Sequence, residues 1–251
     1  MAEICAAKGR RKLVMLTCYD YSFARLLNGR VDMLLVGDSL GNVILGYPRT
    51  THVTLQDMIR HTAAVRRGAP DTFLIADLPA GSYDDPETAI QSAHLLVEAG
   101  ADAVKPEGRP EIVSALTSAG FSVMGHLGYL PQSQESFRVV GRDESEAEQV
   151  LAAALSMQTA GAFSVVLECL PSQPAERITS RLTIPTIGIG AGPHCDGQVL
   201  VLYDLLGLFT DFQPKFVRRY ADLASIITEA VDRFILDVKQ GNFPNKKEEY
   251  R

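Results

Sequence analysis

Short apolar runs alternate with longer segments of helical periodicity along almost the whole 251-residue chain. The helical segments, such as 55–68, 87–100, 145–161 and 221–241, end in Gly, as helix C-termini often do. The apolar runs show little polar alternation, which is typical of a parallel sheet covered by helices on both faces. Seven such runs are predicted strands, at residues 12–20, 32–39, 72–79, 101–108, 121–128, 163–169 and 185–192.

This alternation restricts the fold to two classes. Seven strand–helix units and a weaker eighth strand near 212–217 predict an α/β protein with a (β/α)8 TIM barrel. A doubly wound open sheet is the alternative that the pattern leaves open. No linker, repeat or low-complexity segment interrupts the chain, so we expect one barrel domain over residues 1–251, with a short polar C-terminal tail. The segment 40–54 is long for a strand–helix connection and is predicted to be a functional loop.

Charge and hydropathy argue against several kinds of partner. The chain is 46% hydrophobic with a net charge of −6, and its basic residues are scattered apart from a short run at 8–12. We therefore expect no nucleic-acid partner. No apolar stretch approaches the ~18 residues of a membrane span, so no membrane association is expected. The cysteines lie far apart, without metal-binding spacing, which predicts reduced thiols and a cytoplasmic location; they are Cys5, Cys18, Cys169 and Cys195.

Charged side chains occur where the predicted strands end. The carboxyl ends of barrel strands face a single mouth, where barrel enzymes build their active sites. A functional site therefore explains these residues better than a set of unrelated surface charges does. Acids gathered this closely also need a counter-ion. The residues are Asp20, Asp38, Asp77, Lys105, Glu107, His126 and Glu168.

Oxygen ligands without paired Cys or His favour a hard cation, most simply Mg²⁺. Asp38 and Asp77 are the best candidate ligands because each follows directly on an apolar strand, and Glu107 is a third ligand, direct or through water. Lys105 lies two residues before Glu107 and hence on the same face of its strand. An ion-paired lysine stays protonated, which suits anion binding. A Schiff base on Lys105 is the alternative.

Two further features have open interpretations. The stretch "GIGAG" at 188–192 ends the seventh strand, a common phosphate-binding position in barrels. It lacks the spacing of a nucleotide-binding loop, so close backbone packing is the favoured interpretation. His126 fits a metal ligand, an acid–base group or a hydrogen-bonded core residue, whereas His61, within a helical segment, is expected to be structural.

Together, several motifs resemble the ketopantoate hydroxymethyltransferase family. They are "VGDSLG" at 36–41, "IADLP" at 75–79, "AGADAVKPEG" at 99–108, "GHLGYLPQS" at 125–133 and "GIGAGPHCDGQ" at 188–198. The resemblance covers residues 12–244. It implies a (β/α)8 barrel that binds Mg²⁺ and transfers a hydroxymethyl group from 5,10-methylenetetrahydrofolate to 3-methyl-2-oxobutanoate, giving 2-dehydropantoate for pantothenate and coenzyme A biosynthesis. Enzymes of this family are homo-oligomers, commonly homodecamers.

The resemblance also implies residue roles. Asp38 and Asp77, with Glu107, match the metal-linked acids of the family. The residues with which the family binds the small 2-oxo acid match Asp38, Ser39, Asp77 and Lys105. Glu168 matches the catalytic base, which removes the C3 proton to give an enolate that Mg²⁺ stabilises. That enolate then attacks the one-carbon unit of the folate.

The chain departs from the family pattern at several positions. Tyr129 and Leu130 replace a typical Leu-Thr, Asn42 replaces an apolar residue, and Pro106 separates Lys105 from Glu107. Ala80 and Gly81 replace bulkier residues. None of these departures removes a proposed catalytic group, but they bear on pocket shape and folate fit.

Two other functions fit the same scaffold. A Mg²⁺-dependent lyase or mutase of the phosphoenolpyruvate–isocitrate lyase type builds a similar site, although a reactive Cys or a phosphate grip would be expected. A non-catalytic binding protein is the second alternative. The joint presence of Asp38, Asp77, Lys105, Glu107 and Glu168 argues against it.

Overall fold

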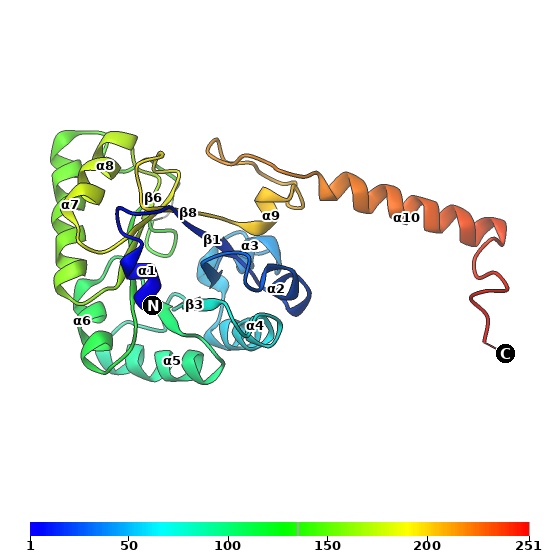
Figure 1. Ribbon diagram of the computed structural model, residues 1–251, viewed down its shortest axis with the longest axis horizontal. Coiled ribbons are helices and arrows are strands. Elements are labelled where there is room, and N and C mark those ends of the chain that lie inside the picture. Colours follow the sequence, from blue (N-terminus) through cyan, green and yellow to red (C-terminus); the bar gives the residue numbers. More distant parts are fainter. Residues whose placement is uncertain (135, 251) are drawn as a thin grey trace. The chain divides into compact units, whose positions relative to one another are not determined.

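The computed structural model describes residues 1–134 and 136–250, and it contains eight parallel strands (Figure 1). They pair in the order β4-β3-β2-β1-β8-β7-β6-β5. A parallel bridge between Val104 and Val123 joins the two ends of this order, so the sheet closes into the predicted (β/α)8 barrel rather than an open sheet. The strands are β1 (Leu13–Thr17), β2 (Met33–Val36), β3 (Phe73–Asp77), β4 (Ala103–Lys105), β5 (Met124–Gly128), β6 (Ser164–Glu168), β7 (Thr186–Ile189) and β8 (Gly197–Leu200).

The prediction of the eighth strand was wrong. Residues 212–217 form no strand, and β8 lies earlier, at Gly197–Leu200. Pro214 lacks the N–H that a strand ladder needs. In β8, a Cβ at Gly197 would lie 2.6 Å from the Leu13 carbonyl oxygen, so glycine is required for β8 to pair with β1. Glycine has a low propensity for strands, so the start of β8 is hard to recognise in the sequence.

Helices follow the strands and lie on the outer side of the barrel, as α5, α6 and α7 show in Figure 1. Side chains of Asp20, Thr54, Asp85 and Asp143 accept backbone N–H bonds at the N-termini of α2, α4, α5 and α7. Such caps satisfy donors that have no partner within the helix. The outer helices are α2 (Tyr21–Leu27), α4 (Leu55–Gly68), α5 (Pro86–Glu98), α6 (Pro110–Ser118), α7 (Glu144–Thr159) and α8 (Ser172–Arg181).

The segment 40–54, predicted as a loop, contains a short helix α3 (Leu40–Val43) and a 3-10 turn η1 (Thr50–His52). The two pack tightly, since a Cβ at Gly41 would lie 2.6 Å from a methyl group of Val53. The connection after β2 is therefore a compact folded element rather than an open loop.

The core of the barrel consists of alternate strand residues that point inward. Met33, Ile75, Ala103, Met124 and Val166 belong to one buried cluster inside the barrel. Ile4 of the N-terminal helix α1 (Ala2–Ala6) joins this cluster, so α1 closes the end where the strands begin. Side chains along a strand point alternately into and out of the barrel. The next inward positions on these strands therefore lie at the opposite end of the barrel, where the strands end.

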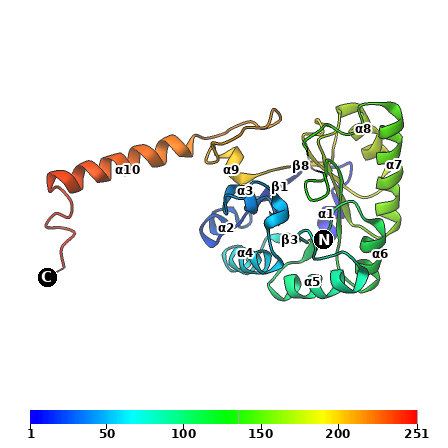
Figure 2. The same ribbon diagram turned by 180° about the vertical axis from the view of Figure 1, so that it is seen from behind.

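The chain divides into two compact units, Met1–Val201 and Leu202–Arg251. The second contains α9 (Leu202–Leu205) and α10 (Leu223–Gln240), a continuous helix seen clearly in Figure 2. Gly241 ends α10 in the left-handed conformation. That all 251 residues act as one domain with a polar tail stays a prediction. Within the described part of the chain, no helix is long and apolar enough to cross a membrane.

Candidate active site

A layer of charged side chains follows directly on the apolar layer inside the barrel. Asp77 lies two residues beyond Ile75, Lys105 two beyond Ala103, His126 two beyond Met124 and Glu168 two beyond Val166. Inward-pointing side chains recur at every second residue of a strand. The inward position that follows each of these core residues therefore lies at the mouth of the barrel. Asp38, Asp77, Lys105, Glu107 and His126 are buried there, and the Glu168 side chain is 20% exposed.

Lys105 and Asp77 are paired by the register of β3 and β4. The Lys105 ammonium lies 2.8 Å from Asp77 Oδ1. Burial lowers the pKa of Lys105, but Asp77, Glu107 and Asp38 outweigh burial, and the pKa is raised. Lys105 is therefore a cation held among acids, which favours anion binding over Schiff-base formation because an imine needs the neutral amine.

Asp38 is buried beside other acids. Its backbone N–H donates to Asp77 Oδ2 at 3.1 Å, which holds the Asp77 carboxylate against the backbone after β2. Burial, followed by the charges of Asp77 and Glu107, raises the pKa of Asp38 to about 7, against the opposing effects of Lys105 and Gln132. The next residue, Ser39, shares a 2.8 Å hydrogen bond with the Tyr19 hydroxyl.

His126 lies between two acids. Its Nε2 is 3.1 Å from Glu168 Oε2, and its Nδ1 is 3.4 Å from Glu107 Oε1. Burial and Lys105 lower the pKa of His126, but the bonds to Glu107 and Glu168 prevail and raise it to about 9. Among the roles left open by the sequence, this geometry disfavours a metal ligand and a base, because a protonated ring has no free nitrogen to bind a metal or accept a proton. It agrees with a hydrogen-bonded buried histidine.

Two polar residues of the site were missed by the sequence analysis. Gln132, in the loop after β5, donates from Nε2 to Asp38 Oδ2 at 2.8 Å and from its backbone N–H to Glu107 Oε2 at 3.1 Å. Tyr83, in the loop after β3, donates to Gln132 Oε1. Both residues lie beyond the strands, where the period of two gives no signal. Gln132 is within the quoted motif "GHLGYLPQS", but an uncharged amide there did not stand out.

Asp20, expected among the acids at the mouth, has a structural contact there. Its carboxylate accepts the Phe23 N–H at 2.9 Å and caps α2. An N-cap aspartate after a strand looks the same in sequence as a catalytic acid. His61, expected to be structural, bonds through Nδ1 to the Tyr19 carbonyl oxygen.

The predicted metal ligands agree with a cation in donor chemistry and in charge. Asp38, Asp77 and Glu107 are hard oxygen donors, and burial together with the charges of Asp77 and Glu107 raises the pKa of Asp38 despite the opposing charge of Lys105. Within residues 1–134 and 136–250, however, no three His, Cys, Asp or Glu side chains are grouped as a metal-binding set. The assignment of these three ligands therefore stays a prediction.

The stretch "GIGAG" agrees with close packing. A Cβ at Gly192 would lie 2.6 Å from the Ser172 hydroxyl, and one at Gly188 would lie 3.0 Å from the Cys195 sulfur. The glycines thus allow the end of β7 to approach α8 and the segment before β8. All four cysteines are free thiols.

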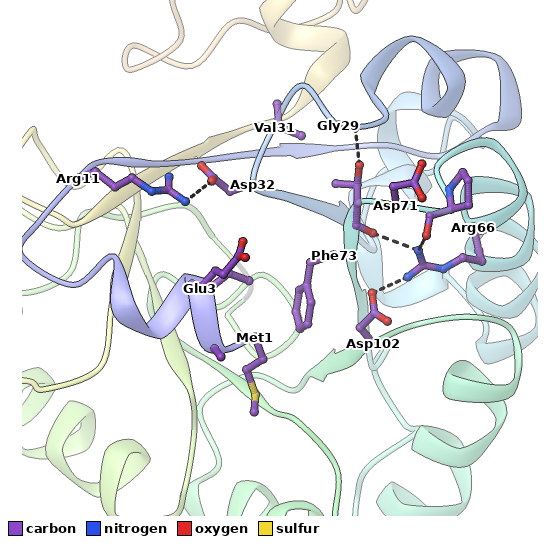
Figure 3. Close-up of a pocket in the computed structure, with 14 residues that line it drawn as sticks. Met1, Glu3, Arg11, Gly29, Val31, Asp32, Arg66, Asp71, Phe73 and Asp102 are labelled. Carbon is purple, nitrogen blue, oxygen red and sulfur yellow. Dashed lines mark hydrogen bonds and ion pairs between the residues drawn. The ribbon is translucent and has the colours of Figure 1, made fainter.

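A cavity of about 570 Å³ lies at the opposite end of the barrel, beside α1 (Figure 3). It is lined by residues that precede or begin the strands, such as Asp32, Phe73 and Asp102. Four of its charged groups form two ion pairs, Arg11 with Asp32 and Arg66 with Asp102. This cavity contains none of the charged layer described above.

The chain matches known proteins over nearly its whole length. The family model described as ketopantoate hydroxymethyltransferase matches residues 1–246. A 3-methyl-2-oxobutanoate hydroxymethyltransferase of Pyrobaculum calidifontis is 51% identical, covering 98% of this chain and 95% of the relative. One of Moorella thermoacetica is 47% identical, covering 100% and 97%.

Solved structures with low sequence identity share the fold. A 2,3-dimethylmalate lyase, a PEP mutase/isocitrate lyase superfamily member, has a TM-score of 0.62 at 16% identity, covering 99% of this chain and 91% of the other. A phosphonopyruvate hydrolase in complex with oxalate and Mg²⁺ has a TM-score of 0.65 at 12% identity, covering 98% and 92%. At this level of identity, the likeness extends to the barrel fold alone.

Proposed function

Because the chain belongs to the ketopantoate hydroxymethyltransferase family, we propose that it transfers a hydroxymethyl group from 5,10-methylenetetrahydrofolate to 3-methyl-2-oxobutanoate, giving 2-dehydropantoate. The reaction needs a site that binds a small anion, stabilises charge on its 2-oxo oxygen and removes a proton from C3. The observation that carries the proposal is the layer of buried charges in which a cationic Lys105 lies among acids while the carboxylate of Glu168 is partly exposed.

Asp38, Ser39, Asp77 and Lys105 bind the 2-oxo acid in this proposal. Lys105 places a positive charge where negative charge develops on the oxo oxygen, and a preorganised charge in a buried site stabilises a transition state strongly. The charges of Asp77, Glu107 and Asp38 raise the pKa of Lys105 against the effect of burial, which favours the cationic form that this role needs.

Glu168 is the base that accepts the C3 proton. His126 Nε2 faces only one of its oxygens, Oε2, at 3.1 Å, and the side chain is partly exposed. Through this bond, His126 orients the carboxylate toward the centre of the mouth. The carbanion formed at C3 then bonds to the one-carbon unit of the folate. The C–N bonds to that carbon break, one water supplies the hydroxyl oxygen of the product, and tetrahydrofolate leaves.

Asp38 and Asp77 would hold Mg²⁺, with Glu107 as the third ligand. Mg²⁺ bound there supplies a Lewis acid for the 2-oxo group. The support from this chain is the grouping of three buried carboxylates, Asp38, Asp77 and Glu107, of which burial and the two neighbouring acids raise the pKa of Asp38.

We also propose that the protein works as a homo-oligomer, with the homodecamer of related enzymes as the expected size. Ile227, Val231, Phe234 and Val238 lie at helical spacing on α10 and are each about half exposed. An apolar stripe of this kind is typical of an interface. The free cysteines support the expected cytoplasmic location.

The proposed activity is tested by formation of 2-dehydropantoate from 3-methyl-2-oxobutanoate and formaldehyde. We expect conversion that depends on tetrahydrofolate, stops with chelator and returns with Mg²⁺. Full activity in excess chelator would reject the metal assignment. Cleavage of a 2,3-dimethylmalate-type substrate without folate would instead indicate a lyase.

A further inference from the structure

Two aromatic rings lie at the mouth of the barrel, next to the proposed base. Tyr129 follows β5 directly, and its ring centroid is 5.4 Å from that of Phe137 in an edge-to-face arrangement. Tyr129 is partly buried, whereas Phe137 is 63% exposed. None of the roles assigned above uses this pair, and Tyr129 is one of the positions where the chain departs from the family pattern.

The loop that carries these rings is fixed beside Glu168 at both ends. The Tyr129 N–H donates to the Glu168 carbonyl oxygen at 2.9 Å, and the Val140 N–H donates to that of Cys169 at 3.0 Å. Gly128 makes the first contact possible, because a Cβ there would collide with the Glu168 backbone. Between these ends, Gln132 is bonded to Asp38 and Glu107. The aromatic pair therefore has a defined place at the rim.

Arg49 adds a positive charge to the same mouth of the barrel. It lies in the segment that follows β2, and this segment and the loop after β5 both leave the carboxyl ends of barrel strands. Burial and the charge of Glu168 raise the pKa of Tyr129, and the Arg49 guanidinium acts in the opposite direction. Arg49 is exposed, and in the described parts of the chain its guanidinium forms no ion pair.

We propose that Tyr129, Phe137 and Arg49 form the subsite for the outer part of the one-carbon donor. This inference rests on the proposed function. The methylene carbon of the folate must reach C3 of the 2-oxo acid near Glu168. The p-aminobenzoyl ring and its glutamate then extend outward to the rim. The ring stacks on the aromatic pair, and a glutamate carboxylate pairs with Arg49.

Calorimetry with tetrahydrofolate tests this subsite without turnover. We expect Tyr129→Leu and Phe137→Leu each to raise the Kd for tetrahydrofolate about 3- to 10-fold, the usual effect of losing an aromatic contact. Tyr129→Phe keeps the ring and should bind nearly as wild type does. Phe121→Leu makes the matched change just before β5, at the other end of that strand, and should leave the Kd unchanged.

Arg49→Gln tests the charge separately. It should weaken binding of tetrahydrofolate but not of tetrahydropteroate, which has the ring without the glutamate. The Kd for 3-methyl-2-oxobutanoate is measured for every variant. It should stay at the wild-type value if these residues form a folate subsite, and it should rise together with the folate Kd if they only support the structure of the loop.

Three results would overturn the inference. They are an unchanged Kd for tetrahydrofolate in both leucine variants, an equal loss of 2-oxo acid and folate binding, and a change in sedimentation without a change in folate binding. The last would identify Phe137 as a contact between copies. Failure of the proposed function is distinguishable, because the wild-type protein would then form no 2-dehydropantoate.

Discussion

His126 connects two carboxylates of the site that have different proposed roles. Its ring faces Glu107 through Nδ1 and Glu168 through Nε2, and these two acids raise its pKa to about 9 against burial and Lys105. A protonated His126 donates from Nε2 to Glu168 and lies within ion-pair distance of Glu107 through Nδ1. It is therefore a positioning residue, which fixes the orientation of the base and leaves proton removal to Glu168.

Gln132 has a similar role for Asp38, although it carries no charge. We expect Gln132→Met to weaken Mg²⁺-dependent binding of 3-methyl-2-oxobutanoate about 10- to 100-fold, because groups that orient a metal ligand typically have effects of this size. Calorimetry with and without Mg²⁺ measures the effect. The matched control is Gln91→Met, the same change at an exposed position of α5. Binding unchanged from wild type would show that Asp38 does not depend on this amide.

At the scale of elements, the sequence analysis succeeded where a strand is a plain apolar run and failed where packing decides. Seven strands were predictable because each is a continuous apolar run, and the charged residues were predictable because they occur where those runs end. β8 was missed because close approach to β1 requires Gly197. Gln132 and Tyr83 were missed because loop conformation, which has no period, brings them to the site.

Asp196 joins three elements of the barrel. It accepts bonds from Lys8 after α1 at 2.7 Å and from the Thr186 N–H of β7 at 2.9 Å, just before β8 begins. We expect Asp196→Asn to lower the free energy of unfolding by about 1–3 kcal/mol, the usual effect of losing charge-assisted bonds at a buried site. Urea unfolding measures this, with exposed Asp84→Asn as the control.

The effect of Asp196 should depend on pH. Burial raises the pKa of Asp196, but Lys8 and Thr186 outweigh burial, and the pKa is lowered from 3.8. A lowered pKa in the folded state gives stability that is present above about pH 4 and lost as the pH falls through the folded value. The difference between wild type and Asp196→Asn should therefore shrink below pH 4. If the difference in free energy of unfolding stayed constant down to pH 2, the charge of Asp196 would not be the source of this stability.

At the scale of the whole molecule, the proposed oligomer depends on α10. We expect the double variant Ile227→Asp, Val231→Asp to form smaller assemblies in sedimentation velocity, because two charges interrupt the apolar stripe. Glu229→Lys, on the opposite side of the helix, should leave the assembly unchanged. Identical sedimentation of all three proteins would exclude α10 from the interface.

The central claim is that Glu168 removes the C3 proton within the charged layer of the barrel. It is tested most directly by NMR of proton exchange at C3 of 3-methyl-2-oxobutanoate in D₂O, with Mg²⁺ and without folate. Glu168→Gln keeps the size of the side chain but cannot accept the proton. We expect exchange to slow by about 10²–10⁴ while the variant still binds the 2-oxo acid. Exchange at the wild-type rate would contradict the account and assign proton removal to another group.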